Sequence, residues 1–110
     1  KLNENPFLLG QNLARDLLPK IKDSKSDFIV TFSDGIAQGV AHYLDKHGIS
    51  VPSKIKILGF DKIDSIDFLK FPISTIEVPV NKMIDKLIEL IEKPSRSNFE
   101  HICPTKLHLE

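Results

Sequence analysis

Two short apolar runs with a helical pattern between them restrict the folds open to this sequence more than any other feature. Residues 28–32 (FIVTF) and 55–60 (IKILGF) are rich in the β-branched and aromatic side chains that favour strands. Between them, Ile36, Val40 and Leu44 recur at helical spacing. A strand, a helix and a strand in this order form a βαβ unit, whose right-handed crossover makes the two strands parallel. The uninterrupted run at 28–32 also predicts a strand covered on both faces.

Capping residues define the expected ends of the middle helix. Ser33 and Asp34 are both types preferred at a helix N-cap, and we interpret Asp34 mainly as that cap. Gly48 predicts a left-handed residue that closes the helix, because glycine adopts that conformation without a steric penalty.

The flanking segments are expected to extend the same α/β arrangement. Apolar spacing over 8–18 predicts a helix that Pro19 ends or kinks, because proline lacks a backbone donor and crowds the preceding turn. After residue 60 the pattern predicts turns or a short helix over 61–72, a strand at 74–78, an amphipathic helix from Val80 to Pro94, and a short strand within 102–109.

The charge balance and the cysteine content limit the classes of protein to which this chain can belong. Fifteen basic residues balance fifteen acidic ones, so the chain has no electrostatic footprint for a phosphate backbone. Cys103 is the single cysteine and cannot form an internal disulfide, which favours a reducing compartment. No run of apolar residues is long enough to span a bilayer, and the first residues lack the apolar stretch of a signal peptide. We therefore expect a cytoplasmic protein with no membrane partner.

Two candidate binding positions follow from the predicted sheet. Ligands of open parallel sheets bind at the carboxyl ends of the strands, where loops diverge and helix N-termini expose their amides. Ser33 follows the first predicted strand and Asp61 follows the second. A hydroxyl and a carboxylate on one edge suit a ligand rich in hydroxyl groups. The alternatives are a helix cap at residues 33–34 and a simple turn residue at 61.

Motifs for metal binding or catalysis are missing from the sequence. Asp61, Asp64 and Asp67 lack the glycine and the terminal glutamate of a calcium loop. The histidines and Cys103 do not have zinc-ligand spacing, and Ser33 does not lie in a G-x-S-x-G motif. Gly35 and Gly39 belong to no phosphate-binding motif, and they indicate close packing of the helix on the sheet instead. We expect no metal, no cofactor and no enzymatic activity.

Four segments together resemble the C-terminal half of the sensor domain of LacI/GalR (lactose-repressor) family regulators. Residues 32–39 (FSDGIAQG) resemble the family's (A/S)(N/S)D-x-x-A-x-G segment, and 47–52 (HGISVP) resemble its x-G-x-x-V-P turn. Residues 57–61 (ILGFD) resemble (V/I)(V/I)G(F/Y)D, and 71–79 (FPISTIEVP) resemble P-x-L-T-T-(I/V)-x-x-P. The resemblance runs from about residue 7 to the end, with the four motifs in the family's order.

The resemblance implies a three-layer α/β/α parallel sheet of the periplasmic-binding-protein-like type, with an effector held between two subdomains. The effector would be a sugar or a nucleobase, bound by Ser33 and Asp61, with Phe7 stacking on it. A homodimer would form through the helix at 34–47 and the segment at 64–71, with contacts at Gln38 and Leu69. Operator DNA would be bound only by a headpiece outside this chain. A sugar-binding protein of a transport system is the main alternative, and an α/β enzyme fragment is a more distant one.

The resemblance also divides the chain into three parts. Residues 1–79 would form part of the C-terminal effector-binding subdomain, 80–98 would form a helix that packs on the other subdomain, and 99–110 would return as a strand. The apolar stripe of that helix needs a cover, because each large apolar side chain removed from water contributes roughly 1.5–3 kcal/mol. We expect another copy of the chain or a rearranged helix to cover it.

Overall fold

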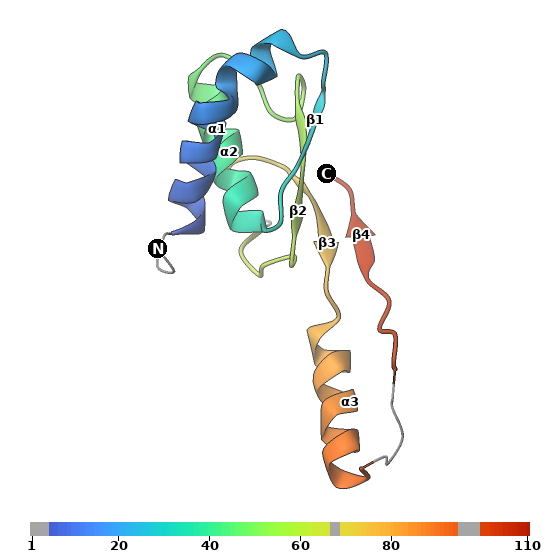
Figure 1. The fold of residues 1–110 in the computed structure, drawn as a ribbon. Coiled ribbons are helices and arrows are strands. Elements are labelled where there is room, and N and C mark those ends of the chain that lie inside the picture. The colour runs from blue at the N-terminus through green and yellow to red at the C-terminus, as the bar shows by residue number, and fades with distance from the viewer. Residues whose placement is uncertain (1–4, 67–68, 95–99) are drawn as a thin grey trace.

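The computed structural model describes residues 5–66, 69–94 and 100–110. Its elements follow the order α1 (Pro6–Asp23), β1 (Phe28–Val30), α2 (Asp34–Lys46), β2 (Lys56–Phe60), β3 (Ser74–Glu77), α3 (Val80–Glu92) and β4 (Lys106–His108). The sheet has the order β1-β2-β3-β4, in which the first three strands are parallel and β4 is antiparallel to β3 (Figure 1). The α/β class and the βαβ unit expected from the sequence are confirmed, with a mixed rather than purely parallel sheet.

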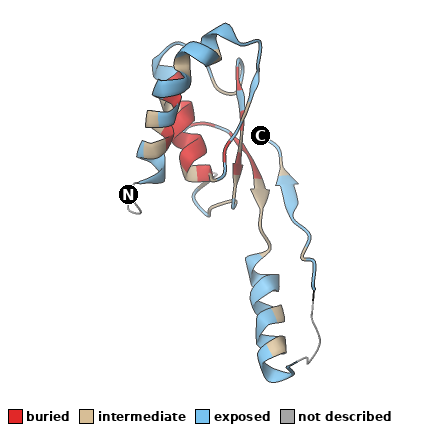
Figure 2. Cartoon of the chain, in the orientation of Figure 1, coloured by how far each residue is buried: buried red, intermediate tan, exposed pale blue. Residues whose placement is uncertain are grey.

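The core lies between α2 and the sheet. Leu44 on α2 and Ile57 on β2 are both fully buried, and α1 packs along α2 on the same face of the sheet (Figure 2). Gly10 and Gly39 let the two helices approach closely. A Cβ on Gly10 would lie 2.2 Å from the Ile36 carbonyl oxygen, and one on Gly39 would lie 2.0 Å from the Phe7 carbonyl oxygen. The packing role expected for Gly39 is therefore present, and α1 rather than the sheet is the neighbour.

The opposite face of the sheet is open in the described part of the chain. Phe28 and Val30 are 46% and 64% exposed, whereas Ile29 between them packs against the core. Leu107 on β4 shares the open face, because cross-strand partners point to the same side of a sheet, and it is 56% exposed. The prediction that the strand at 28–32 is covered on both faces was wrong, because no described helix lies over its second face. Two of the three expected layers are therefore present.

The first helix continues beyond Pro19, so of the two outcomes predicted at this residue the helix end is wrong. α1 ends at Asp23, and the N–H of Ser24 donates to the carbonyl oxygen of Lys20. Proline in a helix interior costs about 3 kcal/mol in a helix without other support. Here the turn after Pro19 carries Ile21, which packs against the core and offsets part of that cost. Residues 20–23 therefore belong to the last turn of α1.

Helix α3 stands away from the sheet and from the other two helices (Figure 1). None of its residues is buried, and its apolar stripe is exposed. Ile91 is 78% exposed and Leu87 is 58% exposed. A rearranged helix that covers the stripe, one of the two expected solutions, is not present in the described part of the chain. Among the described helices, none is long and apolar enough to cross a membrane.

Candidate functional site

Ser33 and Asp61 lie at the same edge of the sheet. Each follows the carboxyl end of its strand, and β1 and β2 are parallel neighbours with Val30 opposite Leu58. Continuing this register places the residues after the two strands at the same level. The sequence rule for open parallel sheets therefore selects the edge at the carboxyl ends of β1 and β2.

Ser33 is the N-cap of α2. Its Oγ accepts a hydrogen bond from the Ile36 N–H at 3.2 Å. The interpretation of Asp34 as the cap was wrong, because Ser33 precedes the helix in an extended conformation and Asp34 is already its first helical residue. The Ser33 hydroxyl still has a hydrogen to donate after capping. The loop is further held by the Thr31 hydroxyl, 3.0 Å from the Ser33 carbonyl oxygen.

Asp34 is fully buried and connects three segments of the chain. Its Oδ1 accepts from the Thr75 hydroxyl at 2.6 Å, and its Oδ2 accepts from the Ile63 N–H at 2.9 Å. Gly59 makes room for this carboxylate, since a Cβ there would lie 2.3 Å from Oδ1. Within the described residues no buried side-chain nitrogen or oxygen lacks a hydrogen-bond partner. The buried charge is thus placed where its oxygens are satisfied.

Asp61 is exposed and has an uncommon backbone conformation. Its φ is 96° and that of Lys62 is 49°, both in the left-handed region. The Asp61 side chain borders a hollow of about 500 Å³ at the carboxyl ends of β2 and β3. Other charged residues that line this hollow are Lys62, Asp64, Glu77, Lys82 and Lys106. The sequence analysis missed Glu77, although the same strand-end rule would have selected it.

The other residues predicted for the site are placed elsewhere. Ser33 and Phe7 do not line the hollow beside Asp61. The Phe7 ring is tilted against the His42 ring of α2, with centroids 5.4 Å apart. Gln38 is 4% exposed, and its side-chain amide donates to the Phe71 carbonyl oxygen at 2.8 Å. Its side chain therefore fastens the segment before β3 onto α2 and is not available to a partner. Leu69 is partly exposed.

The described residues include no group of three or more His, Cys, Asp and Glu side chains that could hold a metal ion. Cys103 lies beside Met83 and His101 at a separate hollow of about 260 Å³ against α3. This arrangement is remote in the chain from the strand ends that carry Ser33 and Asp61.

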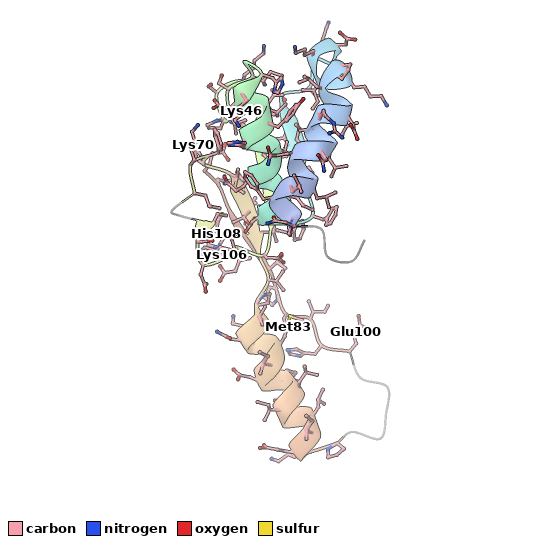
Figure 3. The ribbon with its side chains drawn as sticks, turned by 90° about the vertical axis from the view of Figure 1, so that its left-hand side faces the viewer. Lys46, Lys70, Met83, Glu100, Lys106 and His108 are labelled. Carbon is pink, nitrogen blue, oxygen red and sulfur yellow. The ribbon has the colours of Figure 1, made fainter. Side chains whose placement is uncertain are left out.

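Glu77 and His108 form a pair across the β3–β4 ladder. His108 lies near Lys106 on β4 (Figure 3). The Glu77 Oε2 and the His108 Nε2 are 2.6 Å apart. The hydrogen bond with His108 lowers the pKa of Glu77 below its ordinary value of 4.5, against an opposing contribution from desolvation. The positive charges of His108, Lys62 and Lys106 lower it further.

Acid is expected to loosen this pair. A carboxyl group whose pKa is lower in the folded than in the unfolded state stabilises the fold above its unfolded pKa, and that contribution is lost as the pH falls through the folded pKa. The contribution of Glu77 should therefore be complete above pH 4.5 and disappear below it. A carbon-NMR titration of the Glu77 carboxyl group checks this. In His108→Ala the pKa should return toward 4.5, whereas a midpoint at or above 4.5 in the unchanged chain would contradict the assignment.

Sequence comparison identifies related proteins over most of the chain. Residues 4–102 match the family described as periplasmic binding protein-like domain. The chain is 26% identical over 102 residues to the HTH-type transcriptional regulator LacR of Lactobacillus helveticus, a match that covers 89% of this chain and 30% of LacR. The matches cover 19–30% of the length of the curated relatives.

Structure comparison leads to the same group of proteins. The fold is similar to that of a sugar-binding transcriptional regulator of the LacI family from Escherichia coli, which was solved with phosphate. The TM-score is 0.77 and the identity 27%, and the match covers 94% of this chain and 37% of that regulator. It is also similar to a LacI family regulator from Enterococcus faecalis with bound ribose, with a TM-score of 0.70 and 26% identity over 89% of this chain and 38% of that one.

Proposed function

This chain belongs to the periplasmic binding protein-like domain family, and from that membership we propose that it forms part of the effector-sensing domain of a LacI-type transcription regulator. Its relatives are named as transcription regulators and repressors, and its structural neighbours are regulators of the LacI family. These relatives favour a regulator over the transport protein that the sequence left as the main alternative. The proposed activity is binding, with no chemical step.

The position of Asp61 carries the proposal. Its carboxylate is exposed, follows a parallel strand and borders a hollow of about 500 Å³. Such strand ends are where open α/β sheets bind ligands, and an ionised carboxylate makes strong hydrogen bonds to hydroxyl groups. Ser33, at the same sheet edge, contributes a hydroxyl group. A polar small molecule, most simply a sugar, fits this chemistry, and the ribose bound by the Enterococcus faecalis neighbour has the same chemistry.

The sensing mechanism proposed is a shift between two arrangements of the domain. An effector held both by this edge and by a second subdomain would favour one arrangement over the other. A homodimer would pass that preference to DNA-binding headpieces, which fits the designation of the relatives as helix-turn-helix regulators. The segment at 64–71, with Leu69, remains the proposed dimer contact, while Gln38 is too deeply buried for one. Such a regulator would act in the cytoplasm.

The Asp61→Ala variant tests the binding site. In the whole regulator, we expect it to lose response to the effector, because a hydrogen bond to a charged group contributes about 1.5–3 kcal/mol, or roughly 10-fold to 150-fold in affinity. Thermal unfolding with a panel of sugars and nucleobases, beginning with ribose and sucrose, provides the measurement, since a ligand raises the stability of the state that binds it.

Asp16→Asn is the matched control, because Asp16 is an exposed carboxylate on α1 whose partner is Arg15 and which does not border the hollow. Every compound that stabilises the unchanged regulator should stabilise this control equally. A panel compound that stabilises the Asp61→Ala variant as much as the unchanged regulator would remove Asp61 from the site. A panel without any stabilising compound would count against a sugar or nucleobase effector.

A further inference from the structure

The loop that carries Asp61 is fastened by three consecutive backbone amides. The N–H of Asp61 donates to the Ile76 carbonyl oxygen at 2.9 Å, that of Lys62 to the Thr75 hydroxyl at 3.2 Å, and that of Ile63 to the Asp34 carboxylate at 2.9 Å. Only the first of these is an ordinary bond between backbone groups. The other two depend on side chains from β3 and α2, so the loop conformation is set by residues far away in the sequence.

The two side chains form one continuous network. The Thr75 hydroxyl accepts from Lys62 and donates to Asp34 Oδ1 at 2.6 Å, so its single hydrogen is committed to the carboxylate. Thr75 is 2% exposed and Asp34 is 0% exposed, so the hydrogen bond between them is buried. The network joins the start of α2, the end of β2 and the strand β3, which lie side by side at one edge of the sheet (Figure 1).

The anchored loop holds its residues in a conformation that they would rarely adopt alone. Asp61 and Lys62 both have positive φ angles, 96° and 49°. Residues other than glycine hold such angles only where the surrounding structure imposes them. The anchors coincide with these two residues and the one that follows. The side chains of Thr75 and Asp34 thus bond to the amides of the two residues that directly follow Asp61.

We propose that Asp34 is a positioning residue: with Thr75, its buried carboxylate holds the loop 61–63, in which Asp61 and Lys62 have positive φ, in the conformation that presents Asp61 to the effector. This inference rests on the proposed function for the identity of Asp61 as a ligand-binding group. Asp34 itself does not touch the effector. Because Asp34 directly follows Ser33, the same residue also fixes the distance between the two polar groups of the sheet edge.

Amide hydrogen exchange of the full chain, followed by NMR, tests the proposal without any ligand. In Asp34→Asn one acceptor oxygen is replaced by a donor, and in Thr75→Val the hydroxyl is lost with little change of shape. Thr75→Val should speed exchange of the Lys62 amide roughly tenfold or more, because that N–H loses its acceptor. Asp34→Asn should speed exchange of the Ile63 amide, because a neutral amide oxygen is a weaker acceptor than a carboxylate oxygen. The couplings that report φ at Asp61 and Lys62 should leave their left-handed values.

Two further variants separate positioning from a general contribution to the fold. Thr75→Ser keeps the hydroxyl and should restore slow exchange at Lys62. Ser74→Ala removes a buried hydroxyl from the neighbouring residue of β3, which bonds with Glu110 on the other face, and should leave the loop 61–63 unchanged. Thr75→Val also serves as the second test if Asp34→Asn does not fold.

Two results would overturn the inference. One is unchanged exchange at Lys62 and Ile63 in both Asp34→Asn and Thr75→Val. The other is an equal rise in exchange throughout α2 and the sheet, which would mean that Asp34 only stabilises the fold. This experiment uses no ligand, so either result leaves the proposal that Asp61 binds the effector unaffected. In the same way, a negative result of the Asp61→Ala test would not change what hydrogen exchange reports about the loop 61–63.

Discussion

Gly39→Ala is expected to destabilise the chain by about 3 kcal/mol or more, at the upper end of what overpacking costs. The added Cβ would lie 2.0 Å from the Phe7 carbonyl oxygen and 3.0 Å from the Gln11 nitrogen, so the obstacle is the backbone of α1 rather than a side chain that can rotate. In an open helix the same change would stabilise by about 1 kcal/mol, because alanine is the better helix former. The structure therefore predicts an effect of the opposite sign.

Urea unfolding followed by circular dichroism measures the free energy of unfolding for this variant. Gly10→Ala, on the other helix of the contact, should have a similar effect, since its Cβ would lie 2.2 Å from the Ile36 carbonyl oxygen. Gly48→Ala is the control for open space. A Cβ at Gly48 meets nothing within 4 Å, and only its φ of 79° opposes the change, at about 1 kcal/mol. A stabilised Gly39→Ala chain would refute the close contact of α1 and α2.

Gly59→Ala is expected to cost about 3 kcal/mol through a different cause. The Cβ would lie 2.3 Å from Asp34 Oδ1, so the carboxylate must move away from its donors or β2 must shift. The expected loss combines overpacking with weakened hydrogen bonds to a buried charged group, each of which costs about 1–3 kcal/mol. The same unfolding measurement applies.

A double-mutant cycle identifies the collision partner. Asp34→Ala alone should destabilise the chain, because the Thr75 hydroxyl and the Ile63 N–H lose their acceptors. Once the carboxylate is gone, Gly59→Ala should cost at least about 1 kcal/mol less than it does in the unchanged chain, as contacting residues are not additive. Additive losses would mean that the Cβ at 59 is opposed by something other than Asp34.

Local sequence patterns were sufficient for the elements and for the family. The apolar runs at 28–32 and 55–60 flank a helix with a three-residue and four-residue apolar repeat, and that order produces the βαβ unit observed. The four motifs placed the chain with LacI-type proteins, as the family match and the structural neighbours confirm. These predictions succeeded because each depends on residues close together in the chain.

Predictions that depend on contacts between residues far apart in the sequence were wrong in three places. Ser33 and Asp34 are equally good cap types, and the sequence does not reveal that donors 29 and 41 residues later claim the carboxylate. Gln38 was predicted at a dimer surface, and its bond to Phe71, 33 residues away, places it inside. Pro19 was predicted to end or kink a helix, and the local pattern does not include the packing of Ile21 on the core, beyond which the helix continues.

The exit and the return of the chain use neighbouring strands. β3 leads out to α3, and β4 returns antiparallel beside it, with Glu77 opposite Lys106 at the outer end of the ladder. Both attachments of α3 are therefore at one margin of the sheet. A force that tilts α3 would pull on one of the strands β3 and β4 and release the other. The hydrogen bonds between β3 and β4 would carry this load before the core under α2 does. The β3–β4 hydrogen bonds nearest α3, around Glu77 and Lys106, would break first.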